Sequence, residues 1–380
     1  MAEQKPMGLY VHIPFCAKKC DYCDFTSYPM DKQAQIMYLK GIFEEIDQLK
    51  DNFCDKIFDT IYIGGGTPSF VYDGFISELS FKIFSSFQFA DKVEFTIEVN
   101  PSSFTREKFY EYLKAGVNRI SVGVQCLNSH LLANHGRLQS LKSVKNTFKM
   151  LKNADFANVS GDVMLGLPGQ TEHMVTKTVK FLIKNGCSHI STYALQIEKG
   201  TIMYDKFKRG QLRLVPDAKQ LAIYNKVYDI LKKNGFKRYE VSNFARPGFE
   251  SHHNSKYWDG TNYLGLGVSA HSFIGDYRYY NTKRVDTYLD AMRQGKSAVF
   301  KREYLDTQTR RTECIMLALR TAKGLNLEEF LKTFNEDIMQ THAGIIKKFI
   351  DNNMLELKDG YLRVTEQYFY VSNSIILELI

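Results

Sequence analysis

The chain has 380 residues, a formal net charge of +8 and a hydrophobic fraction of 44%. This length suggests two domains, and the apolar fraction suits a globular protein with a substantial core. We find no apolar run of the roughly 18 residues that a membrane helix needs and no signal-type segment, so we expect a cytoplasmic protein. The mild basic excess would attract an anionic partner, such as nucleic acid, a porphyrin with propionates or an acidic membrane surface, without choosing among them.

The seven cysteines are odd in number and mostly scattered, which argues against a disulfide framework and for a reducing compartment. We expect Cys54, Cys126, Cys187 and Cys314 to be ordinary buried thiols. The other three cysteines form the first motif of the chain.

This first motif is a cysteine loop, in which Cys16, Cys20 and Cys23 follow the spacing C-x3-C-x2-C after a strand-like run. We expect three thiolates this close together to converge on one centre, and thiolates select zinc or iron–sulfur clusters. Lys18 and Lys19 lie between them and would favour the thiolate forms that bind metal.

A fourth cysteine is missing from this loop, because Phe25 stands where one could have been. A structural zinc ion or an ordinary four-iron cluster usually takes four protein ligands. We therefore interpret the loop as the site of a 4Fe–4S cluster with one iron open to an outside ligand. Zinc is the alternative, with His12 as the fourth ligand, although His12 lies in the strand-like run 9–13 and its side chain need not face the loop.

Strand-like segments alternate with helical patterns through the first half of the chain. The expected strands cover 9–13, 58–63, 94–99, 119–125, 158–165 and 189–197, and the expected helices cover 32–50, 77–87, 105–113, 140–151, 171–184 and 216–234. In the first helix the apolar residues recur at three- and four-residue steps, which gives one buried stripe. The strands are rich in Ile, Val and Tyr, which is typical of a parallel sheet covered on both faces.

This alternation predicts an α/β fold with a parallel sheet and right-handed crossovers. A full barrel would need eight such units, so six units fit a partial (β/α)6 barrel. Ligands of such folds bind at the carboxyl ends of the strands. The glycine-rich turn 64–67 and the polar residues Glu98, Gln125 and Asp162 all fall at or close to such ends, which predicts a ligand site there.

The chain changes character after residue 215. After the helix 216–234 come the segment 239–244, the aromatic motif 252–258 and a glycine-bearing stretch to 267. Helices are expected over 311–321, 327–334 and 342–352, and the segments 355–358 and 361–364 pair around Asp359-Gly360, a favoured hairpin turn. We expect a barrel core over 1–215, an extension over 216–300 and a mostly helical, winged-helix-like domain over 301–380.

The cysteine spacing after a strand resembles the signature of radical S-adenosylmethionine (SAM) enzymes. The longer strings Y-x-H-I-P-F-C and C-D-Y-C-D-F resemble the branch that contains anaerobic coproporphyrinogen III oxidase and a related family of heme chaperones. In that branch the oxidase carries C-x3-C-x2-C-x-C, whereas this chain has Phe25 at the last position, as the chaperones do. The resemblance runs from Tyr10 to about Ser272 and implies a radical SAM barrel with a 4Fe–4S cluster and bound SAM.

Several residues near the strand ends could hold SAM. Glycines let backbone N–H groups approach a methionyl group closely, Glu98 could accept from an ammonium, Arg137 could pair with a carboxylate, and Asp162 could hold ribose hydroxyls. The resemblance implies SAM contacts at Tyr10, Tyr22, Gly65, Gly66, Thr67, Glu98, Gln125, Arg137, Asp162 and the backbone of Ala194. Gln139 stands two places past Arg137, where members of the branch commonly carry a histidine, which puts any role of that histidine in doubt here.

A second constellation, His253-Asn254-x-x-Tyr257-Trp258, contains the only tryptophan. A histidine flanked by aromatic rings can be an axial heme ligand, and a packed loop is the structural alternative. The resemblance implies that this H-N-x-x-Y-W motif binds heme through His253. His271 is a second candidate ligand, and His252 is adjacent but not assignable.

The resemblance implies a radical SAM protein that binds heme and delivers it to client hemoproteins, served by an electron donor such as a flavodoxin or ferredoxin. An oxygen-independent coproporphyrinogen III oxidase, which decarboxylates propionates, is the alternative, and Phe25 counts against it. A third hypothesis is a nucleic-acid binder acting through the C-terminal part, where Arg310 and Arg311 form a small basic patch. A homodimer and peripheral membrane association are compatible with the sequence, which does not say whether SAM is cleaved catalytically.

Overall fold

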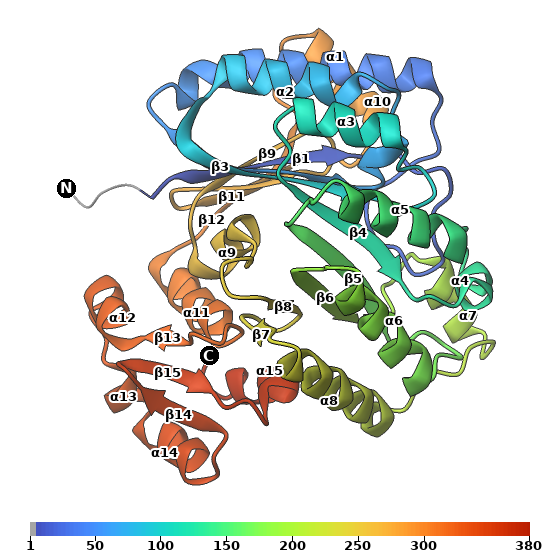
Figure 1. Ribbon diagram of the computed structural model, residues 1–380. Coiled ribbons are helices and arrows are strands. Elements are labelled where there is room, and N and C mark those ends of the chain that lie inside the picture. Colours follow the sequence, from blue (N-terminus) through green and yellow to red (C-terminus); the bar gives the residue numbers. More distant parts are fainter. Residues whose placement is uncertain (1–4) are drawn as a thin grey trace.

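The structure is a computed structural model that describes residues 5–380. Its central feature is a curved sheet in which six parallel strands neighbour one another in chain order (Figure 1). These strands are β1 (Met7–Ile13), β2 (Ile57–Gly65), β3 (Gln88–Val99), β4 (Arg119–Gln125), β5 (Val159–Leu165) and β6 (His189–Ala194). The predicted α/β fold, with six parallel strands in a partial barrel, is therefore confirmed.

The helices that connect these strands cover the outer face of the sheet (Figure 1). They are α1 (Lys32–Leu49), α2 (Phe75–Ser86), α3 (Arg106–Lys114), α5 (Leu141–Asn153) and α6 (Glu172–Lys184). Asp31, Thr105, Ser140 and Thr171 cap four of them, since each side chain accepts a hydrogen bond from a backbone N–H in the first turn. Each of the five predicted helices between these strands is present, with ends within two residues of the prediction.

Two short helices at the strand ends were not predicted. α4 (Ser129–Asn134) follows β4, and α7 (Ile202–Lys208) follows β6. Both are too short for an apolar period to stand out from the sequence. In α7 the Met203 backbone N–H donates to the Asp21 carbonyl at 2.8 Å, so this helix packs directly on the cysteine loop.

The sheet continues on both sides of the six predicted strands, to twelve strands in all among residues 5–380. Beside β1 lie β9 (Tyr263–Leu266), β10 (His271–Ile274), β11 (Tyr277–Asn281) and β12 (Val299–Tyr304), and beside β6 lie β8 (Asn243–Ala245) and β7 (Lys237–Arg238). The connecting helices are α8 (Asp217–Lys233), α9 (His252–Asp259) and α10 (Val285–Arg293). The aromatic motif 252–258 therefore lies on a helix.

The C-terminal part forms its own layer beside the barrel (Figure 1). It contains α11 (Thr307–Ala318), α12 (Leu327–Phe334), α13 (Ile338–Thr341), α14 (Ala343–Asp351) and α15 (Ser372–Ile376), with a small sheet of β13 (Leu325–Asn326), β14 (Leu355–Lys358) and β15 (Tyr361–Val364). Asp359 and Gly360 have φ angles of +55° and +79°, as a tight two-residue hairpin between β14 and β15 requires. The predicted mostly helical, winged-helix-like arrangement is confirmed.

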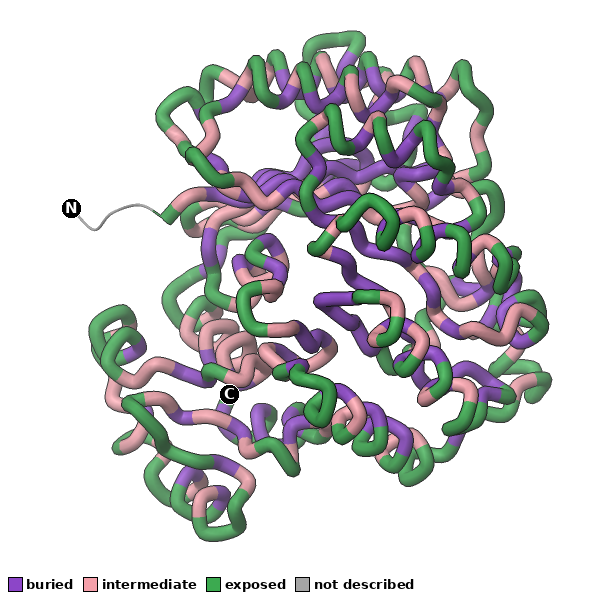
Figure 2. The backbone as a smooth tube through the Cα atoms, viewed as in Figure 1, coloured by how far each residue is buried: buried purple, intermediate pink, exposed green. Residues whose placement is uncertain are grey.

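Buried residues, purple in Figure 2, belong mainly to two large apolar cores. One core runs from Met7 to Ala298 and includes the sheet extension and α8, so the segment 216–300 shares the apolar core of the barrel. The other runs from Ile315 to Leu379. No helix within residues 5–380 is long and apolar enough to span a membrane.

The four scattered cysteines differ in burial. Cys126 and Cys187 are buried as predicted, and Cys314 is half-buried. The prediction is wrong for Cys54, which is exposed because it follows the short 3₁₀ helix Lys50–Phe53 in a surface turn.

Candidate functional site

The carboxyl ends of the parallel strands bring most of the predicted SAM contacts to one end of the barrel. Tyr10 comes from β1, Gly65 from β2, Glu98 from β3, Gln125 from β4, Asp162 from β5 and Ala194 from β6. Gly66 and Thr67 follow β2 directly, Tyr22 lies in the cysteine loop, and Arg137 follows α4. The fold therefore collects at one end residues that are scattered through the first half of the sequence, while their contact with SAM stays a prediction.

The three cysteines of the loop between β1 and α1 are each half-buried. Cys16 Sγ lies 3.2 Å from Thr67 Oγ1, which joins the loop to the end of β2. Burial raises the pKa of Cys23 to about 11 and outweighs the lowering effect of Lys19. Lys19 therefore favours the thiolate of Cys23, as expected, but burial outweighs this effect, so metal binding itself has to drive deprotonation.

His12 is not free to complete a zinc site. Its Nε2 lies 2.8 Å from the Thr26 carbonyl oxygen and its Nδ1 lies 3.0 Å from the Tyr10 hydroxyl. No group of three or more His, Cys, Asp or Glu side chains in the described part of the chain surrounds a single ion. Zinc needs all its ligands on one atom, whereas the thiolates of a 4Fe–4S cluster are spread over its irons. The arrangement fits the cluster better than it fits zinc.

Close backbone contacts hold the glycine-rich turn after β2 against the cysteine loop. Gly66 N–H donates to the Ile13 carbonyl at 2.8 Å, and Thr67 N–H donates to the Phe15 carbonyl at 2.7 Å. A Cβ at Gly66 would lie 2.7 Å from the Phe15 carbonyl oxygen, so only glycine fits. Both N–H groups donate within the protein, so contact of the turn 64–67 with the methionyl group stays a prediction.

Two half-buried carboxyl groups face the interior of the barrel. Glu98 accepts hydrogen bonds from the Tyr62 hydroxyl at 2.8 Å and from Gly65 N–H at 3.2 Å, and burial raises its pKa to about 7. Asp162 accepts from the Ser121 hydroxyl at 3.1 Å, and burial raises the pKa of this carboxyl as well. Each raised pKa shows that burial disfavours the charged carboxylate. A cationic ligand beside these groups would stabilise their ionised forms.

A polar atom of Gln125 at this end of the barrel is buried without a partner. Gln125 ends β4 with φ of +60°, in the left-handed region that non-glycine residues seldom adopt. Its Oε1 makes no hydrogen bond. The nearby hydroxyl of Tyr22 interacts with Cys20 and Arg137. Buried polar atoms of this kind are rare in proteins and indicate a place that a ligand or water completes. The residues present therefore fit a polar cofactor bound beside the cysteine loop.

Arg137 is held in place by a residue whose role the sequence did not reveal. Its Nη2 donates to the Gly123 carbonyl, and its Nε donates to Gln139 Oε1 at 3.1 Å. Gln139 Nε2 in turn donates to the Val124 carbonyl at 2.7 Å. Gln139 therefore positions the guanidinium. In the sequence, the only pointer to this role of Gln139 is its position two residues after Arg137, and that spacing does not specify a contact.

Tyr62 and Ser121 are further site residues that sequence reasoning missed. They lie in β2 and β4, and each donates a hydrogen bond to one of the two half-buried carboxyl groups. In the sequence they look like ordinary strand residues. Their alternation with apolar neighbours, which places them on the inner face, is the signal that could have found them.

The aromatic motif on α9 lies toward the amino ends of the strands. Lys256 ties α9 to β2, because its Nζ lies 2.7 Å from Asp59 Oδ1. His253 is fully buried, with Nδ1 2.8 Å from Thr60 Oγ1 and Nε2 2.8 Å from the Tyr257 hydroxyl. Burial also lowers the pKa of His253 to about 3. The ring is neutral but neither nitrogen is free, so iron binding by His253 stays a prediction that requires one of these hydrogen bonds to break.

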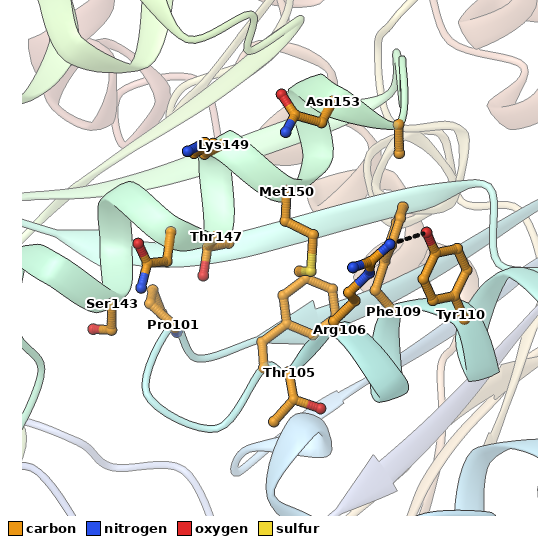
Figure 3. Close-up of a pocket in the computed structure, with 13 residues that line it drawn as sticks. Pro101, Thr105, Arg106, Phe109, Tyr110, Ser143, Thr147, Lys149, Met150 and Asn153 are labelled. Atoms are coloured by element: carbon orange, nitrogen blue, oxygen red, sulfur yellow. Dashed lines mark hydrogen bonds between the residues drawn. The ribbon is translucent and has the colours of Figure 1, made fainter.

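The surface hollows add little to this site. One pocket lies between α3 and α5 on the helical layer, where Phe109 and Met150 form part of the wall and Arg106 donates to the Tyr110 hydroxyl at 3.4 Å (Figure 3). None of the predicted site residues lines it. A second hollow is bordered by Arg137 and neighbouring residues. Only the second hollow adjoins the strand-end site.

Comparisons with known proteins give two family matches. The radical SAM superfamily matches residues 10–182, which hold the cysteine loop and β2–β5. The HemN C-terminal domain matches residues 305–368, which hold the second apolar core from α11 to β15. The two matched segments correspond to the two layers of the fold.

Curated relatives match over almost the whole chain. A heme chaperone HemW from Lactococcus lactis subsp. lactis is 35% identical, over 98% of this chain and 97% of the relative. The heme chaperone HemW from Bacillus subtilis is 30% identical, over 96% of this chain and 97% of the relative. Among solved structures, the coproporphyrinogen III oxidase HemN from Escherichia coli covers 99% of this chain and 90% of its own, with a TM-score of 0.85 at 22% identity, which shows a shared fold.

Proposed function

The chain belongs to the heme chaperone HemW family of radical SAM proteins, and we propose that it binds heme and delivers it to client hemoproteins. In this proposal Cys16, Cys20 and Cys23 hold a 4Fe–4S cluster, and SAM binds at the neighbouring strand ends. When bound and reduced, the cluster can supply the electron that cleaves SAM into methionine and a 5′-deoxyadenosyl radical. The protein residues hold the cofactor and limit the access of water.

The unpartnered amide oxygen of Gln125 near the three-cysteine loop carries this proposal. Gln125 Oε1 is buried without a hydrogen bond at a site whose loop has only three thiols. A cluster that leaves one iron open has room for the amino and carboxylate groups of a methionyl moiety. SAM would give Gln125 Oε1 a hydrogen-bond partner and would complete the coordination of the open iron.

Anaerobic reconstitution followed by separate titrations with SAM and with heme tests the proposal. We expect an iron content of about four per chain, a change of the cluster spectrum on adding SAM, and a saturable heme spectrum. Transfer of bound heme to an apo-hemoprotein is then measured as the appearance of the absorbance spectrum of the heme-loaded client. A reconstituted protein that binds SAM but takes up no heme would contradict the chaperone function and leave the radical SAM site intact.

The coproporphyrinogen III oxidase is a second candidate, because the HemN structure shares the fold over nearly the whole chain. Phe25, 61% exposed, stands in the loop where the oxidase pattern has a fourth cysteine. Incubating the reduced, anaerobic protein with coproporphyrinogen III and SAM decides between the two. We expect no decarboxylated product, and product formation at a useful rate would promote the oxidase.

The remaining partners follow from the same proposal. A flavodoxin or ferredoxin would reduce the cluster, and the protein would work in the cytoplasm as a monomer or homodimer, with peripheral membrane contact where clients require it. Nucleic-acid binding is disfavoured because both arginines of the basic patch, Arg310 and Arg311, form ion pairs within the protein. Arg310 Nη1 lies 2.5 Å from Asp276 Oδ1, and Arg311 pairs with Glu336 through two nitrogen atoms at 2.5 and 2.7 Å.

A further inference from the structure

A row of aromatic and basic side chains crosses the sheet extension formed by β10, β11 and β12. His271 pairs in register with Tyr280, and Tyr280 pairs with Lys301. Residues directly opposite one another in antiparallel strands project from the same face of the sheet. The His271 and Tyr280 rings are stacked, with centroids 4.9 Å apart and an interplanar angle of 21°, and the Tyr280 centroid lies 5.8 Å from that of Phe300.

This surface is open to solvent. His271 is exposed, and Phe300 at the edge of the sheet is 71% exposed. Phe273 stands two residues from His271 on the same strand, which places it on the same face. We name His271, Phe273, Tyr280, Phe300 and the basic residues beside them, Lys283 and Lys301, the His271 platform.

The imidazole of His271 is free, in contrast to that of His253. It makes no hydrogen bond to any of residues 5–380, whereas both nitrogens of His253 are engaged. Partial burial, helped by Lys283 and Arg278, lowers the pKa of His271, so the ring is neutral near pH 7 and has a lone pair for a metal. His252 is exposed too, but it starts α9 and no aromatic ring contacts it in the described part of the chain.

Two cations on the platform lack partners. Lys283 and Lys301 are exposed and form no ion pair within residues 5–380. Arg278, by contrast, is paired with Glu313 at 2.6 Å. Lys301 lies opposite Tyr280, and Lys283 is close enough to His271 to lower its pKa. A flat apolar ring system that carries carboxylates therefore finds aromatic surface, a free imidazole and two nearby ammonium groups without ion pairs.

The platform adjoins the cysteine loop. The Thr26 hydroxyl donates to Ser269 Oγ at 3.0 Å, and the Tyr28 hydroxyl donates to the Lys283 carbonyl at 2.9 Å. The exposed Phe25 directly precedes Thr26 in the chain. A ligand on the platform would therefore lie near the segment that directly follows the cysteine loop, whereas His253 lies toward the amino ends of the strands.

We propose that heme docks on the His271 platform, with His271 as the axial ligand of the iron and with Lys283 and Lys301 pairing with the propionates. This inference rests on the proposed heme binding and adds the place and the ligand. The platform is exposed on one side, which suits a heme that has to leave again for a client. His253 keeps its hydrogen bonds and orders α9.

Titration of the reconstituted full-length protein with ferric heme tests the inference. We compare wild type with His271→Gln, which keeps a polar side chain but lacks the imidazole, and with the matched control His252→Gln. We expect His271→Gln to lose the histidine signature in resonance Raman and electron paramagnetic resonance spectra and to bind heme at least about tenfold more weakly. His252→Gln should match wild type. SAM binding, unchanged in both variants, serves as the control for folding.

The cations are tested with Lys283→Glu and Lys301→Glu. Each should weaken binding of ferric heme several-fold but leave binding of ferric heme dimethyl ester unchanged, because the ester carries no carboxylates. If His271→Gln keeps the wild-type affinity and histidine signature, the inference is wrong and the chaperone function stands. If wild type itself binds no heme while binding SAM, the proposed function falls and this inference falls with it.

Discussion

The strand-end site and helix α9 both contain residues that the sequence singles out, but their polar atoms are in opposite states. At the strand ends Gln125 Oε1 is buried without a partner. On α9 both ring nitrogens of His253 lie 2.8 Å from hydroxyl oxygens of Thr60 and Tyr257. The first region is incomplete without a ligand, and the second is complete as it stands.

This difference has an energetic meaning. A buried polar atom without a hydrogen bond costs about 1–3 kcal/mol, which a bound ligand can recover. A histidine whose nitrogens are both engaged has to lose a comparable amount before it can bind iron. A ligand at the strand ends would therefore gain this free energy. His253 on α9 instead packs within the protein, where its ring stacks on that of Tyr62 with centroids 5.2 Å apart.

The largest effect should come from removing the cluster ligands. Replacing Cys16, Cys20 and Cys23 together with Ala should abolish iron uptake and the iron–sulfur absorbance after anaerobic reconstitution, because the cluster would lose all its thiolates. Cys54→Ser is the matched control, since Cys54 is exposed and outside the loop. Full iron content in the triple variant would place the cluster elsewhere and remove the basis of the comparison.

The pH dependence of stability should report Glu98. Burial raises its pKa from 4.5 to about 7, so the folded apo-protein retains a proton that the unfolded chain releases. The stability that this proton contributes is complete below about pH 4.5 and is lost as the pH rises through 7, a difference of about 3 kcal/mol. Glu98→Gln should flatten this fall in the free energy of unfolding, measured by urea denaturation.

Exposed Glu44 provides the control for that measurement, because Glu44→Gln should leave the pH profile unchanged. SAM carries a net positive charge and favours the ionised carboxylate, so SAM affinity should rise with pH over the same range. A Glu98→Gln profile that still falls like wild type would show that another group, such as buried Glu240 with its pKa also raised to about 7, carries the dependence.

Gln125 and Gln139 form a pair that separates binding from stability. Gln125→Ala should weaken SAM binding about tenfold, the loss of one buried hydrogen bond, without lowering the stability of the apo-protein. Gln139→Ala should lower both, because both polar ends of Gln139 already make hydrogen bonds. Isothermal titration with SAM and urea denaturation measure the two quantities. An equal loss of stability in both variants would mean that the Gln125 amide already makes stabilising interactions in the apo-protein.

Much of the fold could be predicted because the barrel helices and parallel strands repeat clear patterns. The hairpin around Asp359-Gly360 was readable because few residue pairs favour two successive positive φ angles. The strands β9–β12 were missed because they are short, and because β9, which joins them to the sheet, pairs with β1 about 250 residues earlier in the sequence. The exposure of Cys54 was missed because a single residue in a turn carries no period.

The candidate site was predictable in its residues and less so in their contacts. The three cysteines and the strand-end polar residues followed from spacing and from the rule that ligands bind at strand ends. The engaged N–H groups of Gly66 and Thr67 did not follow, because only the fold shows that the cysteine loop passes within hydrogen-bond distance of them. The same holds for His253, whose partner Thr60 lies almost 200 residues earlier in the chain.

The smallest effect, and the sharpest test of the comparison, should come from Tyr257→Phe. The change removes the hydroxyl that holds His253 Nε2 and should cost about 1 kcal/mol of stability, because one buried nitrogen loses its partner. If His253 had to release Tyr257 before binding iron, the variant would bind heme more tightly than wild type. We expect unchanged heme affinity, since His271 binds the iron in our proposal. Tyr263→Phe, which alters the ring packed against Tyr257 at 4.6 Å, is the matched control. Tighter heme binding in Tyr257→Phe, but not in Tyr263→Phe, would show that His253 is the ligand of the heme iron and that its hydrogen bond to Tyr257 breaks on binding.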